Sequence, residues 1–147
     1  MGIDICNAQG YHDLTAYHAL SSIRREEKRL EQYKQLVFIS SPFAGDVGKN
    51  IKNAQKYSRF AIERGVIPFA PHLLFPQFLD DDDASERSLG IHFGLRFLAK
   101  CSEMWVFGLT ITPGMRRELN EAHRLRIKVR HFYDSGREVT KCKNSRL

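Results

Sequence analysis

One stretch of the sequence combines a helix start with a carboxylate a short distance inside the helix. Thr112-Pro113-Gly114 favours a helix start, because threonine is a good N-cap and proline suits the first helical position. Glu118 follows Thr112 by six residues, beyond the first turn, where the helix dipole acts weakly. Two interpretations stay open: a solvent-facing glutamate, which is common on helices, or a carboxylate that acts on a ligand.

A second candidate is the loop Ser40 to Gly48, SSPFAGDVG, which follows an apolar run. It offers hydroxyl groups, flexible backbone N–H groups and a helix N-terminus, a combination that suits a phosphate or a sugar. The loop is neither a Walker A sequence nor a GxGxxG sequence, so those motifs do not support ATP or NAD binding. An ordinary turn is the alternative.

Two histidines stand where they could contribute to a site. His72 directly follows a predicted strand, and His92 lies on a predicted helix. The chain has no credible Ser–His–Asp or Cys–His set, and its six histidines lack metal-site spacing such as HExxH. No metal and no cofactor is therefore expected. The run Asp80 to Asp83 favours a solvated loop over a cation site, because like charges repel.

The bulk composition fits one globular domain. The 147 residues include no apolar run near the roughly 20 needed to span a bilayer, and the first residues lack a signal-peptide pattern. Three widely spaced cysteines predict reduced thiols, so we expect a cytoplasmic protein without membrane association. The net charge of +6 is spread out and suits a small anionic ligand as well as it suits nucleic acid. Without a basic stripe interleaved with aromatic residues, nucleic acid is an unlikely partner.

Strands and helices alternate after a first helix, which starts at Asp13 or Thr15 and ends near Gln35. Apolar runs predict strands at 37–39, 66–70, 104–107 and 127–132, and amphipathic patterns predict helices at 50–64, 88–100 and 114–125. Residues 71–87 are expected to form a long irregular loop, and the tail from Asp134 is expected to fray. We divide the chain into a helical extension (1–36), an α/β domain (37–133) and a polar tail (134–147).

Such alternation is typical of a parallel sheet with helices on both faces. Right-handed crossovers place all strand-to-helix loops at one edge, where ligands bind. The loops 40–49, 71–87 and 108–114 should therefore converge there. Pro68 favours an edge position for its strand, because proline cannot donate a ladder hydrogen bond.

Three segments together resemble the nucleoside 2-deoxyribosyltransferase-like superfamily, and most closely a bacterial and phage branch of it. They are Val37 to Asp46, Pro71-His72-Leu73 and Gly108 to Glu118. The resemblance covers about 37–133. It implies a flavodoxin- or Rossmann-like three-layer sandwich with a parallel sheet of four or five strands.

The resemblance also implies roles for individual residues. Glu118, four residues after Gly114, takes the place of the glutamate that attacks the anomeric carbon. Thr112 takes a position that contacts a sugar hydroxyl or phosphate, and it is closer to the serine of the nucleotide hydrolases than to the aspartate of the transferases. His72 or His92 could protonate the leaving base. The implied substrate-binding residues are Ser40, Ser41, Pro42, Phe43, Gly45, Asp46, Thr112, Gly114 and Met115.

By this resemblance the protein cleaves or transfers an N-glycosidic bond of a nucleoside or nucleoside monophosphate, and hydrolysis is favoured over transfer. A homo-oligomer with a shared site is implied. The alternative is a protein that binds or senses a nucleotide or an ADP-ribose-like ligand without turning it over. A third and weaker hypothesis has the basic helix and tail contact nucleic acid.

Overall fold

The computed structural model of the protein describes residues 13–140. Contacts divide the chain into two units, residues 1–34 and residues 35–147. The first unit contains helix α1 (Leu14–Leu30), whose N-cap Asp13 accepts hydrogen bonds from the backbone N–H groups of Thr15 and Ala16, each at 3.0 Å. The predicted N-terminal helix is confirmed, although it ends before Gln35. None of its residues is buried.

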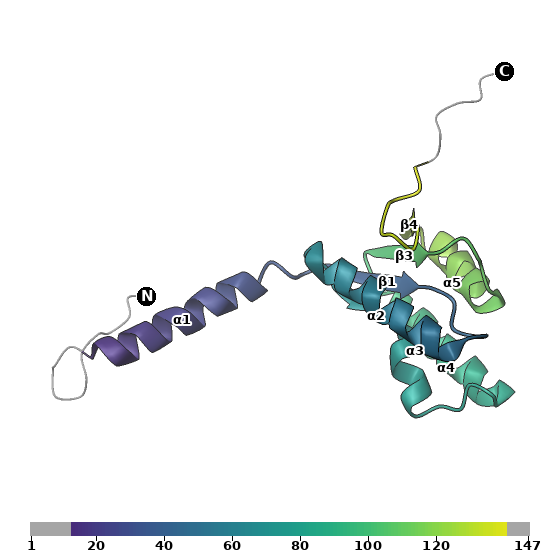
Figure 1. The fold of residues 1–147 in the computed structure, drawn as a ribbon, viewed down its shortest axis with the longest axis horizontal. Coiled ribbons are helices and arrows are strands. Elements are labelled where there is room, and N and C mark those ends of the chain that lie inside the picture. The colour runs from purple at the N-terminus through teal and green to yellow at the C-terminus, as the bar shows by residue number, and fades with distance from the viewer. Residues whose placement is uncertain (1–12, 141–147) are drawn as a thin grey trace, which may run out of the picture. The chain divides into compact units, whose positions relative to one another are not determined.

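The second unit is an α/β domain, as the alternation of strands and helices predicted (Figure 1). Its four strands are all parallel, in the order β2-β1-β3-β4. The elements are β1 (Leu36–Ser40), α2 (Val47–Glu63), β2 (Ile67–Phe69), α3 (Pro71–Leu74), the short 3-10 helix η1 (Phe75–Gln77), α4 (Ala84–Leu98), β3 (Glu103–Phe107), α5 (Pro113–Arg124) and β4 (Lys128–Phe132).

The strand order identifies an edge strand and the point at which the direction of winding reverses. Strand β2, which contains Pro68, is an edge strand, as the proline predicted. The chain moves outward from β1 to β2 and then returns to β3 on the other side of β1. The direction of winding therefore reverses between β1 and β3. In doubly wound sheets the ligand crevice lies outside the carboxyl ends of the strands at this point.

Alternating side chains of the central strands build one core on each face of the sheet. On β1, Val37 and Ile39 pack with residues of α2 such as Tyr57, whereas Phe38 packs with residues of α4 and α5. Strand β3 alternates in the same way, with Trp105 on the α2 face. Because side chains alternate along a strand, Ser40 shares the α4/α5 face with Phe38.

Two stretches are more ordered than the sequence predicted. Residues 71–87 are not one irregular loop, because α3, η1 and the start of α4 lie within them. The expected fraying from Asp134 is wrong for residues 134–139. There the chain folds back, as the Tyr57 hydroxyl donates to Asp134 at 2.8 Å and Arg130 donates twice to Glu138, at 2.9 and 2.7 Å. No helix within residues 13–140 is long and apolar enough to cross a membrane.

Candidate active site

A cavity of about 530 Å³ opens at the carboxyl ends of the strands. All three loops that were expected to converge contribute to it, through residues such as Ser41, His72 and Thr112. The helices α4 and α5 complete its walls. A cavity of this size accommodates a nucleotide-sized ligand.

Glu118 lines this cavity because it lies on the buried stripe of α5. Met115, Leu119 and Ala122 are the buried residues of this helix. Glu118 follows Met115 by three positions and precedes Ala122 by four, so all four side chains share one face of the helix. The helix therefore turns this carboxylate toward the sheet rather than toward solvent.

The carboxylate of Glu118 is hydrogen-bonded to Ser40, the last residue of β1. The Ser40 hydroxyl donates a hydrogen bond of 2.5 Å to Glu118 Oε2, and Ser40 is 1% exposed. Removal from water raises the pKa of the Glu118 carboxyl to about 7, because burial disfavours the charged form. The hydrogen bond from Ser40 opposes this shift, since it favours the carboxylate. The group is thus poised to gain or lose a proton near neutral pH.

A second polar pair lies beside the first in sequence. Ser41 Oγ and His72 Nε2 are 3.0 Å apart, and both residues line the cavity. Burial lowers the pKa of His72 to about 4, so the imidazole is neutral at neutral pH. In the free protein His72 can therefore donate or accept a hydrogen bond, but it carries no positive charge.

The loop after β1 is shaped by backbone contacts. The Asn50 side-chain amide donates to the carbonyl oxygens of Phe43, at 2.9 Å, and Ala44, at 3.0 Å. Asp46 is the N-cap of α2 and accepts from the Lys49 N–H at 3.1 Å. Gly45 has a φ of 98°, which suits glycine. The loop thus presents Phe43 to the cavity, whereas Asp46 and Gly45 shape the turn and, like Pro42, do not line it.

The start of α5 borders the cavity next to Glu118. Thr112 is the N-cap of this helix, as predicted, and its Oγ1 accepts from the Met115 N–H at 3.3 Å. The Thr112 hydroxyl still has its own proton to donate. A Cβ added at Gly114 would come no closer than 3.9 Å to another group, the Thr112 hydroxyl. A Cβ at Gly114, which lines the cavity, would therefore make only ordinary van der Waals contact.

His92 is placed apart from the other candidate residues. It is exposed on α4 and lines a separate hollow between α4 and α5, together with Asn120 and Arg124. It does not line the cavity that holds Glu118 and His72. Of the two histidines predicted to assist the chemistry, only His72 faces the same cavity as Glu118.

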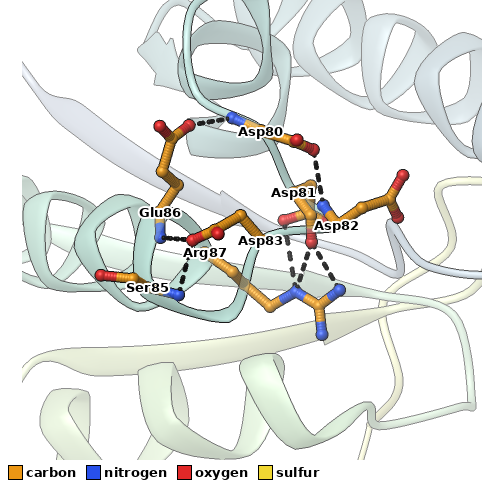
Figure 2. A network of polar contacts seen from close by, with 7 residues as sticks. All are labelled: Asp80, Asp81, Asp82, Asp83, Ser85, Glu86 and Arg87. Atoms are coloured by element: carbon orange, nitrogen blue, oxygen red, sulfur yellow. Dashed lines mark hydrogen bonds and ion pairs between the residues drawn. The ribbon is translucent and has the colours of Figure 1, made fainter.

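The acidic run Asp80 to Asp83 forms hydrogen bonds with residues at the start of α4 (Figure 2). Asp83 caps α4 by accepting from the N–H groups of Ser85 and Glu86, each at 2.9 Å. Arg87 donates from Nε and Nη2 to the Asp81 carbonyl oxygen, at 2.8 and 2.5 Å. Within residues 13–140, no cluster of three or more His, Cys, Asp or Glu side chains is arranged to hold a metal ion.

Three cavity features were missed from the sequence. Arg87 and Arg117 line the cavity, and Asn50 fixes the loop that presents Phe43. No motif marks the arginines, because arginine is common on exposed helix faces and only the packing of α4 against α5 turns these two toward the cavity. The position of Glu118 did leave a signal, the apolar spacing of Met115, Leu119 and Ala122 around it.

Comparison with solved structures supports the fold. The chain resembles a 2-deoxyribosyltransferase from the psychrotolerant bacterium Bacillus psychrosaccharolyticus, with a TM-score of 0.56 and 16% sequence identity. The match covers 71% of this chain and 77% of that one. The resemblance to the nucleoside 2-deoxyribosyltransferase-like fold is thereby confirmed. Among curated proteins no match is found.

A family model matches residues 35–132, which are nearly the whole α/β unit. This range begins just before β1, ends with β4 and includes Ser40, His72 and Glu118. The chain therefore belongs to the family described as a domain of unknown function, DUF7768.

Proposed function

We propose that this protein cleaves the N-glycosidic bond of a nucleoside or nucleoside monophosphate, with Glu118 as the nucleophile and water as the favoured acceptor. One observation carries the proposal. The Glu118 carboxyl, held by Ser40, faces a nucleotide-sized cavity at the reversal point of the sheet. The shared fold with a 2-deoxyribosyltransferase agrees with it.

The reaction runs in two steps. Glu118 Oε1, the oxygen that Ser40 does not bind, attacks the anomeric carbon as the carbon–nitrogen bond breaks. The electron pair of that bond leaves with the base, which takes up a proton from solvent. Water then attacks the same carbon, the ester bond to Glu118 breaks, and the carboxylate is regenerated while the proton passes to solvent. In a transferase a second base replaces the water.

The other cavity residues bind and orient. The Thr112 hydroxyl and the Gly114 N–H suit a sugar hydroxyl or a phosphate, because helix N-termini favour such oxygens. The next two N–H groups of α5 already donate to Thr112. Phe43 provides an aromatic face for the base, with its ring centroid 6.1 Å from that of His72. Neutral His72 supports departure of the base by hydrogen bonding rather than as a cation. The role of His92 stays a prediction from the sequence.

Release of the free base from a panel of nucleosides and 5′-monophosphates tests the proposal. Wild-type protein should release the free base from at least one compound of the panel. Glu118→Gln should lower the rate of this release at least ~1,000-fold, because the amide cannot attack carbon. Glu63→Gln, an exposed glutamate on α2 that lines neither the cavity nor the hollow between α4 and α5, is the matched control and should keep the wild-type rate. Equal rates for wild type and Glu118→Gln would contradict the assignment of the nucleophile.

A second function, ligand binding without turnover, has one observation in its favour. With a pKa of about 7, the Glu118 carboxyl is in large part protonated at neutral pH, and the protonated form is a poor nucleophile. A nucleotide or an ADP-ribose-like ligand would then be held and not cleaved. Tight binding with no base release over hours would favour this function.

We also expect a homo-oligomer. Apolar side chains on the exposed face of α4 support this expectation, since Leu89, Phe93 and Phe97 are 43%, 36% and 48% exposed. Light scattering on the purified protein measures the assembly directly, and a mass of one chain would contradict it.

A further inference from the structure

The cavity that holds Glu118 shares part of its lining with the second hollow, the one that contains His92. This hollow, about 460 Å³ in volume, lies between α4 and α5. Three residues line both spaces, and they are Ser88, Ile91 and Arg117. Arg117 therefore borders both spaces, so a ligand in the first cavity that reaches Arg117 lies next to the second hollow.

Arg117 is the cation at this junction, and it lacks a carboxylate partner among residues 13–140. In the second hollow, Glu121 is already neutralised by Arg124, which donates to it at 2.9 and 2.6 Å. Arg117 therefore forms no ion pair among residues 13–140, although the carboxylates of Asp81, Glu86 and Glu118 line the same cavity.

A second guanidinium lines the first cavity. Arg87 is anchored by the Asp81 carbonyl oxygen through Nε and Nη2, while its Nη1 donates no hydrogen bond to residues 13–140 (Figure 2). Its nearest carboxylate, that of Asp81, is 3.7 Å from Nε in an exposed ion pair. An arginine fixed in this way loses little conformational entropy when it binds an anion.

We propose that Arg117, assisted by Arg87, forms a phosphate-binding subsite at the junction, and that the ligand carries a phosphate chain that runs from the Glu118 cavity into the second hollow. Guanidinium groups recognise phosphate well, because they present paired N–H donors and keep their charge. The first cavity accommodates a nucleotide-sized ligand, and the adjoining hollow leaves space for a further phosphate beside Arg117. The ligand class is therefore a nucleoside diphosphate. This inference rests on the proposed function for the identity of the sugar and base.

The test compares binding, not turnover, so it is separate from the test of Glu118. Isothermal titration of the Glu118→Gln protein uses the four common 2′-deoxynucleosides, their 5′-monophosphates and their 5′-diphosphates. For the preferred base, affinity should rise along this series, with the diphosphate at least ~10-fold tighter than the nucleoside, about 1.4 kcal/mol. Arg117→Gln should abolish this preference, and Arg117→Lys should restore part of it.

Arg116→Gln is the matched control, because Arg116 is an exposed arginine one position earlier that lines neither hollow. It should keep the preference for the diphosphate. Equal affinity along the series, or an unchanged preference in Arg117→Gln, would overturn the inference, and so would no binding by any compound. Phosphate-dependent binding without base release from wild type would uphold the subsite and refute the glycosidase function. Base release from wild type, together with equal affinity along the phosphate series, would uphold the glycosidase function and refute the subsite.

Discussion

Replacement of Glu118 by glutamine should stabilise the protein at neutral and alkaline pH. The reason lies in the pKa of this carboxyl, which burial raises from 4.5 to about 7. Between these values the unfolded chain has lost the proton while the folded chain keeps it, so the free energy of unfolding falls as the pH rises. A neutral amide that accepts from Ser40 avoids this loss.

The size of the effect follows from the shift. Each pKa unit corresponds to about 1.4 kcal/mol, so the carboxylate costs about 3 kcal/mol of folding stability above pH 7. Below about pH 4 the carboxyl is protonated in both states, and the cost vanishes. Glu118→Gln should therefore exceed wild type by about 3 kcal/mol at pH 8 and match it near pH 4.

Urea denaturation at pH 8 and at pH 4 measures this difference. With an m-value of about 1–3 kcal/mol per molar urea, the midpoint at pH 8 should rise by roughly 1–3 M. Glu121→Gln is the control and should change in the opposite direction, because it removes a carboxylate that accepts two hydrogen bonds from Arg124. A Glu118→Gln protein no more stable than wild type at pH 8 would refute the reasoning.

Three further predictions concern neighbouring residues. His72→Asn should become more stable as the pH falls from 6.5 to 4.5, because it lacks the loss of stability that arises in wild type when the unfolded state binds the His72 proton first, and urea denaturation at several pH values measures this difference. In wild type this loss and the gain from Glu118 should nearly cancel between pH 4.5 and 6.5. Gly114→Ala should leave the melting temperature unchanged or higher, since a Cβ meets only ordinary contact there, but should weaken nucleotide binding in a titration. Asn50→Ala should cost about 1 kcal/mol in urea denaturation and raise KM more than it lowers kcat, because it frees the loop that presents Phe43.

The fold could be predicted because its signals are local. The apolar runs at β1 and β3 mark buried strands, and Pro68 identifies the edge strand. The N-cap at Thr112 depends only on residues within one turn. The helices within residues 71–87 also had a local signal, since Pro71 and Pro76 each stand near a helix start, but their short length hid it.

The site could be predicted only in part, because its contacts are distant in sequence. The hydrogen bond from Ser40 to Glu118 spans 78 residues, and that from Tyr57 to Asp134 spans 77. Side-chain alternation along β1 indicates the face of the sheet on which Ser40 lies, and the buried residues of α5 indicate the face of the helix on which Glu118 lies. Neither pattern predicts that the two side chains form a hydrogen bond. Arg117 directly precedes Glu118, and only the packing of α4 against α5 reveals that it lines both hollows.

The central claim is that Glu118 attacks the sugar, and the covalent intermediate tests it most directly. Wild-type protein is incubated with 2′-deoxy-2′-fluoro nucleosides and their 5′-monophosphates, because fluorine slows hydrolysis of the glycosyl ester more than its formation. Peptide mapping by mass spectrometry should locate one added fluorosugar on Glu118, and none in Glu118→Gln. A sugar on another residue, or base release without any adduct, would contradict the claim.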